Sequence, residues 1–94
     1  MPGAPATWRA ARELVRGGNL GRVVFCRVSR STVVEAVDSL RFLFDGATPL
    51  ARSGPTLRYR DFIAAYESRG EHELVLCGTE ATLVVDSDGY RRFA

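Results

Sequence analysis

The stretch from Ser31 to Gly46, STVVEAVDSLRFLFDG, carries signals for both ends of one amphipathic helix and constrains the fold more than any other segment. Glu35 follows Thr32 by three residues, which is the spacing of a capping box. In a capping box, each of the two side chains accepts a hydrogen bond from the backbone amide of the other residue. Gly46 stands where a left-handed residue commonly ends a helix. Apolar residues repeat at helical spacing: Val33, Val37, Leu40 and Phe44, widened by Ala36 and Leu43.

Shorter segments flank this helix on both sides. Trp8–Arg16 is predicted to be a second helix, capped by Thr7 and ended by Gly17-Gly18. The runs predicted as strands are Arg22–Arg30, Thr56–Tyr59, Asp61–Ser68, Glu73–Cys77, Thr82–Asp86 and Tyr90–Phe93. Ser87-Asp88-Gly89 marks a tight hairpin, and other breaks between strands are also short, which favours antiparallel pairing. The predicted fold class is therefore α+β: a mainly antiparallel open sheet with two helices packed on one face.

The alternation of residues along these strands also predicts an apolar surface on the side of the sheet that no helix covers. In the first strand, Val24, Cys26 and Val28 are expected to share one apolar side. The residues expected on the uncovered side are Ile63, Ala65, Val75, Cys77 and Val84. An exposed apolar sheet face favours pairing with another sheet or chain. We therefore expect a homo-oligomer that forms through this face, or a partner chain bound to it.

The length of 94 residues suits one domain with a modest core. Residues 1–6 are rich in proline, glycine and alanine and are expected to be a flexible tail, and residues 7–94 are expected to form the domain. No apolar run is long enough to span a membrane, and the N-terminus lacks the apolar core of a signal peptide, so a cytoplasmic location is expected. Cys26 and Cys77 lie in apolar runs and are expected to be unpaired thiols.

All 13 basic residues are arginines, and the net charge is +2. Without lysine, the chain has no side chain for a Schiff base and no lysine general acid or base. The arginines are scattered, and only Arg58/Arg60 and Arg91/Arg92 form close pairs. We interpret them as solvated strand and loop residues, and nucleic-acid binding is the weaker alternative.

No motif predicts a catalytic, cofactor or metal site: the sequence has no GxGxxG, Walker loop, HExxH or CxxC. His72, between Glu71 and Glu73, is either a general base or metal ligand, or an exposed loop histidine. The second interpretation is favoured, because neighbours on a strand point to opposite faces. Glu35 and Asp38 form either a carboxylate pair or, as we favour, a helix cap and one half of a surface ion pair between Asp38 and Arg41.

Taken in order, four segments resemble the C-terminal domain of Gfo/Idh/MocA oxidoreductases. The family's helix of the type AKxLIxxGxLG, which leads into a strand, is similar to RELVRGGNLGRVVFCRV. A second family helix, of the type HxxDLLRWLLG, is similar to AVDSLRFLFDGATPL. The family's later strands, with the pattern GTxGTLxLD, are similar to FIAAYESRG and LVLCGTEATLVVDSDGYRRF. The resemblance runs from Arg9 to Phe93.

This resemblance implies an open, mainly antiparallel sheet with helices on one face, whose other face often makes subunit contacts. Full-length relatives are NAD(P)-dependent dehydrogenases, or related enzymes, that act on sugars, polyols and similar compounds. Their cofactor and catalytic lysine lie in an N-terminal Rossmann domain. These 94 residues contain neither the Rossmann fingerprint nor a lysine, so this chain alone is expected to bind no cofactor.

The family helix also implies where substrate-side residues would lie. A histidine commonly stands three residues before the aspartate that Asp38 matches, and here that position is Glu35. An aspartate often stands four residues before that histidine, and here it is Ser31. The family's long loop that lines the substrate pocket is lacking, since Arg30 runs straight into Ser31. The candidates by family position are therefore Glu35, Asp38 and Arg41, and no catalytic residue is assigned.

The leading interpretation is a truncated or stand-alone C-terminal domain of this family that is not catalytic alone and acts in assembly. It would pair with itself, or with a partner that carries a Rossmann domain. The alternative is a small-molecule-binding module, or a simple enzyme, with a pocket between helix and sheet. Its polar groups would be Glu35, Asp38, Arg41 and His72.

Overall fold

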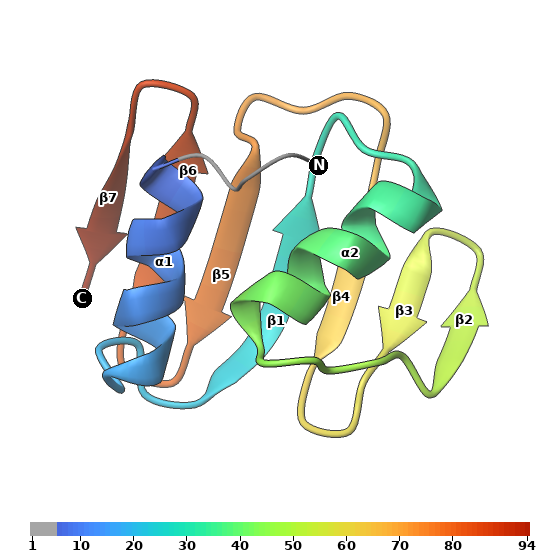
Figure 1. Cartoon of the computed structure of the whole chain (residues 1–94), viewed down its shortest axis with the longest axis horizontal. Helices are drawn as coiled ribbons and strands as arrows, with labels where there is room; N and C mark the ends of the chain where they lie inside the picture. The colour runs from blue at the N-terminus through green and yellow to red at the C-terminus, as the bar shows by residue number, and fades with distance from the viewer. Residues whose placement is uncertain (1–5) are drawn as a thin grey trace.

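A computed structural model of the chain describes residues 6–94 and shows two helices on one side of a seven-stranded sheet (Figure 1). The helices are α1 (Ala6–Arg16) and α2 (Val33–Leu43). The strands are β1 (Val23–Val28), β2 (Ala51–Ser53), β3 (Thr56–Arg58), β4 (Ile63–Tyr66), β5 (Leu74–Gly78), β6 (Thr82–Asp86) and β7 (Gly89–Phe93). The α+β class and the placement of both helices on one face confirm the prediction.

The strand order in the sheet is β2-β3-β4-β1-β5-β6-β7. All neighbouring pairs are antiparallel except β1 and β4, which run parallel. After β1 the chain crosses the sheet in α2, forms the β2–β3 hairpin and returns as β4 beside β1. The sequence predicted the antiparallel majority. It did not reveal the parallel pair, because a connection as long as this one permits either direction.

The capping box predicted for α2 is present. The Thr32 hydroxyl accepts a hydrogen bond from the Glu35 backbone amide at 3.2 Å, and the Glu35 carboxylate accepts one from the Thr32 amide at 3.0 Å. At the other end, Gly46 is left-handed as predicted (φ 85°), but Asp45 before it is left-handed too (φ 50°). The helix is therefore shorter than the predicted segment, because both ends of that segment serve as caps and turns.

Helix α1 begins at Ala6, two residues earlier than predicted. Thr7 consequently lies inside the helix and does not cap it. The helix ends at Arg16, immediately before Gly17-Gly18, as predicted. The other residues of the expected tail, 1–5, lie outside the described residues.

The hydrophobic core fills the space between the helices and the sheet. On α2 the fully buried residues are Ala36, Leu40 and Leu43, whereas Val33 and Val37 are only partly buried. All six residues of the predicted stripe are thus in the core or packed against it, with Ala36, Leu40 and Leu43 at its centre. Helix α2 crosses the strands at a slant (Figure 1), and the side that carries Ala36, Leu40 and Leu43 faces them. Core residues on the strands include Cys26, Val28, Leu57, Ala64, Leu74, Leu76, Leu83 and Val85.

The first strand departs from simple alternation. Cys26 and Val28 are buried as expected, but Val24 is 42% exposed and Val23 is buried in its place. The pairing of β1 with β5 shifts between Val23 and Phe25. Such an irregularity adds a residue to one strand and reverses the alternation beyond it. The prediction that Val24 shares the buried side was therefore wrong.

Candidate functional site

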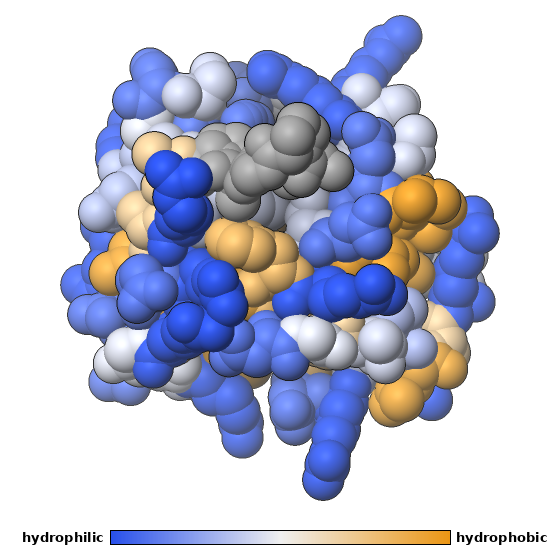
Figure 2. All heavy atoms as spheres, viewed as in Figure 1, coloured by the Kyte–Doolittle hydropathy of each residue, from blue (hydrophilic) through white to orange (hydrophobic). Residues whose placement is uncertain are grey.

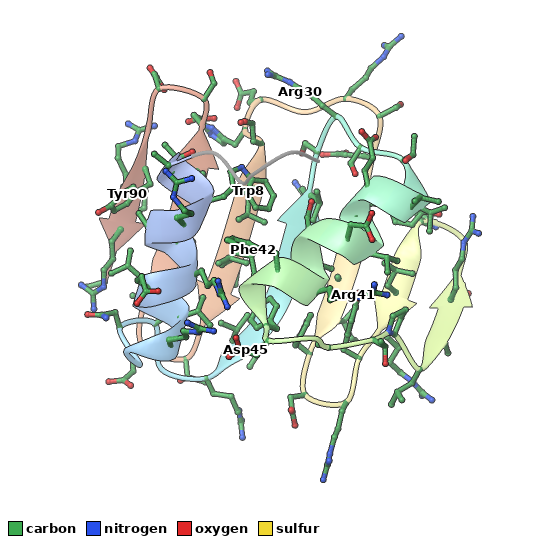
Figure 3. The ribbon with its side chains drawn as sticks, viewed as in Figure 1. Trp8, Arg30, Arg41, Phe42, Asp45 and Tyr90 are labelled. Carbon is green, nitrogen blue, oxygen red and sulfur yellow. The ribbon has the colours of Figure 1, made fainter. Side chains whose placement is uncertain are left out.

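A hollow of about 540 Å³ lies where the two helices begin. The helices converge toward their C-terminal ends, so their N-terminal halves stand apart (Figure 1). Trp8 of α1 lies on one side of the hollow, in the space between the helices (Figure 3), and Glu35 and Asp38 of α2 lie on the other. The other lining residues are Val28, Ser29, Arg30, Ser31, Ser39, Glu73 and Ser87.

The charges around this hollow are mainly negative. Glu35, Asp38 and Glu73 contribute carboxylates, and Arg30 contributes the one positive side chain among the lining residues. The Arg30 guanidinium already donates to two backbone carbonyls, at 3.2 Å to Gly70 and 3.4 Å to Glu71. The hollow therefore suits a neutral polyhydroxyl compound or a cation better than an anion.

Glu35 stands at the position where the resemblance implies a histidine, but its carboxylate is engaged within its own helix. The hydrogen bonds from Thr32, first that of the backbone amide, hold the pKa of Glu35 below its ordinary value. The carboxyl group is therefore ionised at neutral pH and carries no proton to give to a substrate. Its lowered pKa also makes it a weak base.

The structure does not bring the three residues of the family helix to one place. Asp38 lines the hollow beside Glu35, whereas Arg41, one turn further along α2 (Figure 3), is not among the lining residues. The charge of Arg41 acts on Tyr59, whose pKa is raised by burial and pulled back in part by this arginine. A single pocket that includes Glu35, Asp38 and Arg41 is therefore not formed.

The opposite end of the helix pair is closed by an ionic cluster. Asp45, just beyond α2, accepts a hydrogen bond from Arg16 Nε at 3.2 Å, and Arg12 Nη2 lies 3.5 Å from the same carboxylate oxygen. The Arg12 guanidinium also covers the ring of Phe42, 4.8 Å from its centroid. Figure 3 shows Phe42 between the helices and Asp45 where they meet.

His72 is not a plain exposed loop residue, so the favoured sequence interpretation was incomplete. Its Nδ1 lies 2.9 Å and 3.0 Å from the two carboxylate oxygens of Asp86, at the end of β6, and the side chain is half-buried. The two residues are 14 positions apart, and the strand register alone brings them together. The His72–Asp86 pair lines a second, shallower hollow, which is not the one that Glu35 lines. His72 and Glu35 therefore do not share a site.

The far side of the sheet presents two rows of side chains that no helix covers. The first row, read across the strands, is Arg58, Ile63, Phe25, Cys77, Thr82 and Phe93. The second is Thr56, Ala65, Arg27, Val75, Val84 and Arg91. We call these two rows the open face. All five residues predicted for this side belong to it, and Phe25 and Phe93 were missed.

The helix-bearing side differs from this face. In Figure 2 that side is mostly hydrophilic, with smaller apolar areas between and beside the helices. On the open face, Ile63 is 46% exposed and lies beside Phe25, and Phe93 is 50% exposed and lies beside Thr82. The candidate sites are therefore two: the hollow on one side of the sheet and the open face on the other.

Within residues 6–94, no group of three or more histidine, cysteine or carboxylate side chains is placed to hold a metal ion. No helix in that part of the chain is long and apolar enough to cross a membrane. Cys26 and Cys77 are both free thiols, as predicted, and they point to opposite sides of the sheet.

Comparison with known proteins identifies the fold but not a function. No family model matches the sequence, and no curated protein matches it either. Among solved structures, the crystal structure of a probable oxidoreductase, yhhX, is similar to this chain, with a TM-score of 0.58 and 14% sequence identity. The match covers 82% of this chain and 34% of that one, so the chain spans about a third of its neighbour's length. At this identity the likeness shows a shared fold.

Proposed function

We propose that this chain is a C-terminal domain of the Gfo/Idh/MocA type and acts in assembly, without catalysing a reaction by itself. The observation that carries the proposal is the sheet with both helices on one side and an apolar open face on the other. The same fold occurs in part of a probable oxidoreductase. In this chain, the sequence segments that resemble the family form helices and strands of the fold.

Three features of the residues argue against catalysis by these 94 residues alone. They include no lysine and no glycine-rich fingerprint for a dinucleotide. Glu35 occupies the family's histidine position and is held by Thr32. Glu35 and Asp38 line the hollow, and Arg41 is not among its lining residues. In a complete enzyme of this type, NAD(P) and the group that moves the proton would belong to a Rossmann domain.

The open face supports a role in assembly. It gathers Phe25, Ile63, Val75, Val84 and Phe93 on one surface, and such contiguous apolar surface favours association. We propose that this surface holds the domain in an oligomer or on a partner that carries the cofactor domain.

A hydride-transfer assay tests the first part of the proposal. The purified chain is mixed with NAD(P) or NAD(P)H and a panel of sugars and polyols, and absorbance of the reduced nicotinamide is followed. We expect no turnover above the protein-free control. Clear turnover by the chain alone would refute the proposal.

The hollow between the helices favours a second candidate, a small-molecule-binding module. Its carboxylates and serines beside Trp8 fit a polyhydroxyl or cationic ligand. Saturation-transfer NMR with polyols and small amines is the direct test, and Asp38→Asn should weaken any binding. Arg41→Gln is the matched control, because Arg41 belongs to the same helix and is not among the residues that line the hollow. Binding that survives Asp38→Asn unchanged would exclude the hollow.

A further inference from the structure

A largely buried side chain at the hollow has a polar atom without a partner. Trp8 lines the hollow, lies between the helices (Figure 3) and is only 8% exposed. Its indole N–H donates no hydrogen bond to residues 6–94, yet the nitrogen is not sealed in the core as Arg12 Nε and Tyr59 Oη are. The N–H therefore faces an opening, and the opening that Trp8 lines is the hollow. A donor in this position lacks an acceptor, which a ligand can supply.

The wall opposite Trp8 offers a carboxylate without a donor. Asp38 lines the hollow from α2 and forms no hydrogen bond or ion pair within the described part of the chain, so the ion pair predicted with Arg41 is not formed. Glu35, one turn before it, accepts a hydrogen bond from the Thr32 amide at 3.0 Å. Asp38 is therefore the carboxylate that remains for a ligand, and Glu35 adds its negative charge.

The positive charges near the hollow do not neutralise Asp38. The charged lining residues are Glu35, Asp38, Glu73 and Arg30, and the Arg30 guanidinium donates to two carbonyls of the β4–β5 loop. The N-terminal end of each helix adds a partial positive charge of about half a unit, and Glu35 offsets that of α2. The full charge of Asp38 exceeds the partial charge that remains at α1. Within residues 6–94 no three ligating side chains converge on a metal ion, so the cation that fits is organic.

The two unpartnered groups require opposite partners. The indole N–H of Trp8 needs an acceptor, which a hydroxyl oxygen supplies, and Asp38 needs a charged donor, which an ammonium group supplies. A volume of about 540 Å³ is within the usual range for small-molecule sites.

We propose that the hollow binds a hydroxylated organic amine, such as an amino alcohol or an amino sugar. Its ammonium group meets Asp38, and one of its hydroxyl oxygens accepts a hydrogen bond from Trp8. This inference rests on the second candidate of the proposed function and names the class of ligand. It is independent of the proposed role in assembly, because the hollow and the open face lie on opposite sides of the sheet.

Three compounds with one carbon skeleton separate charge from hydroxyl groups. Sorbitol is a neutral polyol, glucamine carries an ammonium group on the same skeleton, and gluconate carries a carboxylate on it. Because the chain has a single tryptophan, one indole N–H signal in the heteronuclear NMR spectrum reports the hollow. We expect glucamine to shift this signal and to bind about tenfold more tightly than sorbitol, because it adds a charge-assisted hydrogen bond. Gluconate should bind more weakly than sorbitol.

Two variants test the two contacts separately. Asp38→Asn keeps the shape of the side chain and removes its charge, so the preference for glucamine over sorbitol should disappear. Asp61→Asn, an equal change of charge on an exposed residue between β3 and β4, is the matched control and should keep the preference. Trp8→Phe keeps an aromatic ring and removes the N–H, and it should weaken glucamine about fivefold by calorimetry. Circular dichroism confirms that each variant is folded.

Any of three results would overturn the inferred ligand. If sorbitol shifts the indole signal and binds as tightly as glucamine, the hollow is a site for neutral polyols, and the binding candidate stands without the amine. If none of the three compounds shifts the signal, the binding candidate fails as well. The third result is a folded Asp38→Asn protein that still prefers glucamine. The first two use the wild-type protein, so they decide the matter even if a variant does not fold. None bears on hydride transfer or on oligomeric state, so the proposed assembly role fails or stands separately.

Discussion

The two faces of the sheet are built from the same strands, yet they have different surroundings. Along β5, Leu74 and Leu76 are fully buried beneath the helices, and Val75 between them is only partly buried on the open face. Along β6, Leu83 and Val85 are fully buried, and Val84 is not. Residues of similar hydrophobicity therefore contribute differently to stability, because only one face has a second layer to pack against.

This comparison separates the residues that stabilise the fold from those to which the proposed function assigns association. Residues under the helices are removed from water when the chain folds, because the helices cover them. Residues on the open face keep it, and their apolar surface remains free to drive binding. If this division is correct, changes on the covered face should affect unfolding, and changes on the open face should affect association. The following predictions test the division, from the largest expected effect to the smallest.

The two cysteines should differ most. Cys26 is fully buried under the helix layer, and burial raises the pKa of its thiol. Cys77 is on the open face. Because the thiolate is the reactive form, Cys77 should react with a disulfide reagent about 1,000-fold faster than Cys26 in the folded protein. Mass spectrometry of partially labelled protein measures both rates. Equal rates would contradict the division, and equal labelling in denaturant is the control.

Leu76→Ala should destabilise the fold by about 3 kcal/mol, because it leaves a cavity in the covered core. Val75→Ala, one residue away on the open face, should cost less than about 1 kcal/mol, because solvent already reaches that side chain. Urea unfolding of the two variants and the wild type measures the difference. Similar losses would mean that the open face is packed within the chain after all.

Gly78→Ala should cost about 2 kcal/mol, because a Cβ there would lie 2.1 Å from the backbone carbonyl oxygen of Leu20. Neither backbone can move without disturbing the core beneath α1. Gly17→Ala is the matched control: its nearest contact is the flexible end of Asn19, so its effect should stay within about 0.5 kcal/mol. Thermal unfolding compares the two variants, and a stable Gly78→Ala protein would show that the close approach is not needed.

Thr32→Ala should cost about 1 kcal/mol, because it removes the side-chain acceptor of the capping box and weakens α2 above the covered face. Ser53→Ala, an exposed position on the edge strand β2, should be close to neutral. Urea unfolding is again the measurement. An unchanged midpoint for Thr32→Ala would mean that packing of Ala36, Leu40 and Leu43 fixes the helix without help from its cap.

The smallest expected effect concerns the ionic cluster above the covered face. Arg16, then Arg12, lowers the pKa of Asp45 below its usual 3.8. A carboxyl whose pKa is lower in the folded state contributes stability at neutral pH and loses it as pH falls through the folded value. Asp45→Asn should therefore flatten the acid decline of the urea midpoint below about pH 4, and added salt should shrink the difference from wild type. Asp88→Asn, in the β6–β7 turn, should leave the decline unchanged.

Several features of the fold were predictable because neighbouring residues encode them. The capping box needs only Thr32 and Glu35 at the right spacing. The β6–β7 hairpin needs only the turn at Ser87-Asp88-Gly89. The apolar alternation that places Val75, Cys77 and Val84 on one face is equally local. Such features depend on hydrogen bonds and side-chain directions within a few residues, and a sequence displays these directly.

The candidate sites were less predictable. Glu35 and Asp38 were candidates from the family position, but the hollow beside them requires Trp8, which belongs to another helix. The pairing of His72 with Asp86 had no signal in the sequence. The exposure of Val24 follows from an irregular pairing with β5. Each of these depends on which segments become neighbours, and that information is not local.

The sequence by itself determined the two helices, most of the strands, and a sheet that is apolar on both sides. Only the tertiary structure decided that β4 lies parallel to β1 and that both helices leave their N-terminal halves apart. It also placed Arg27 at the centre of the open face. The physical reason is that side-chain alternation fixes the face on which a residue lies, whereas the neighbours across the sheet depend on how distant strands pair.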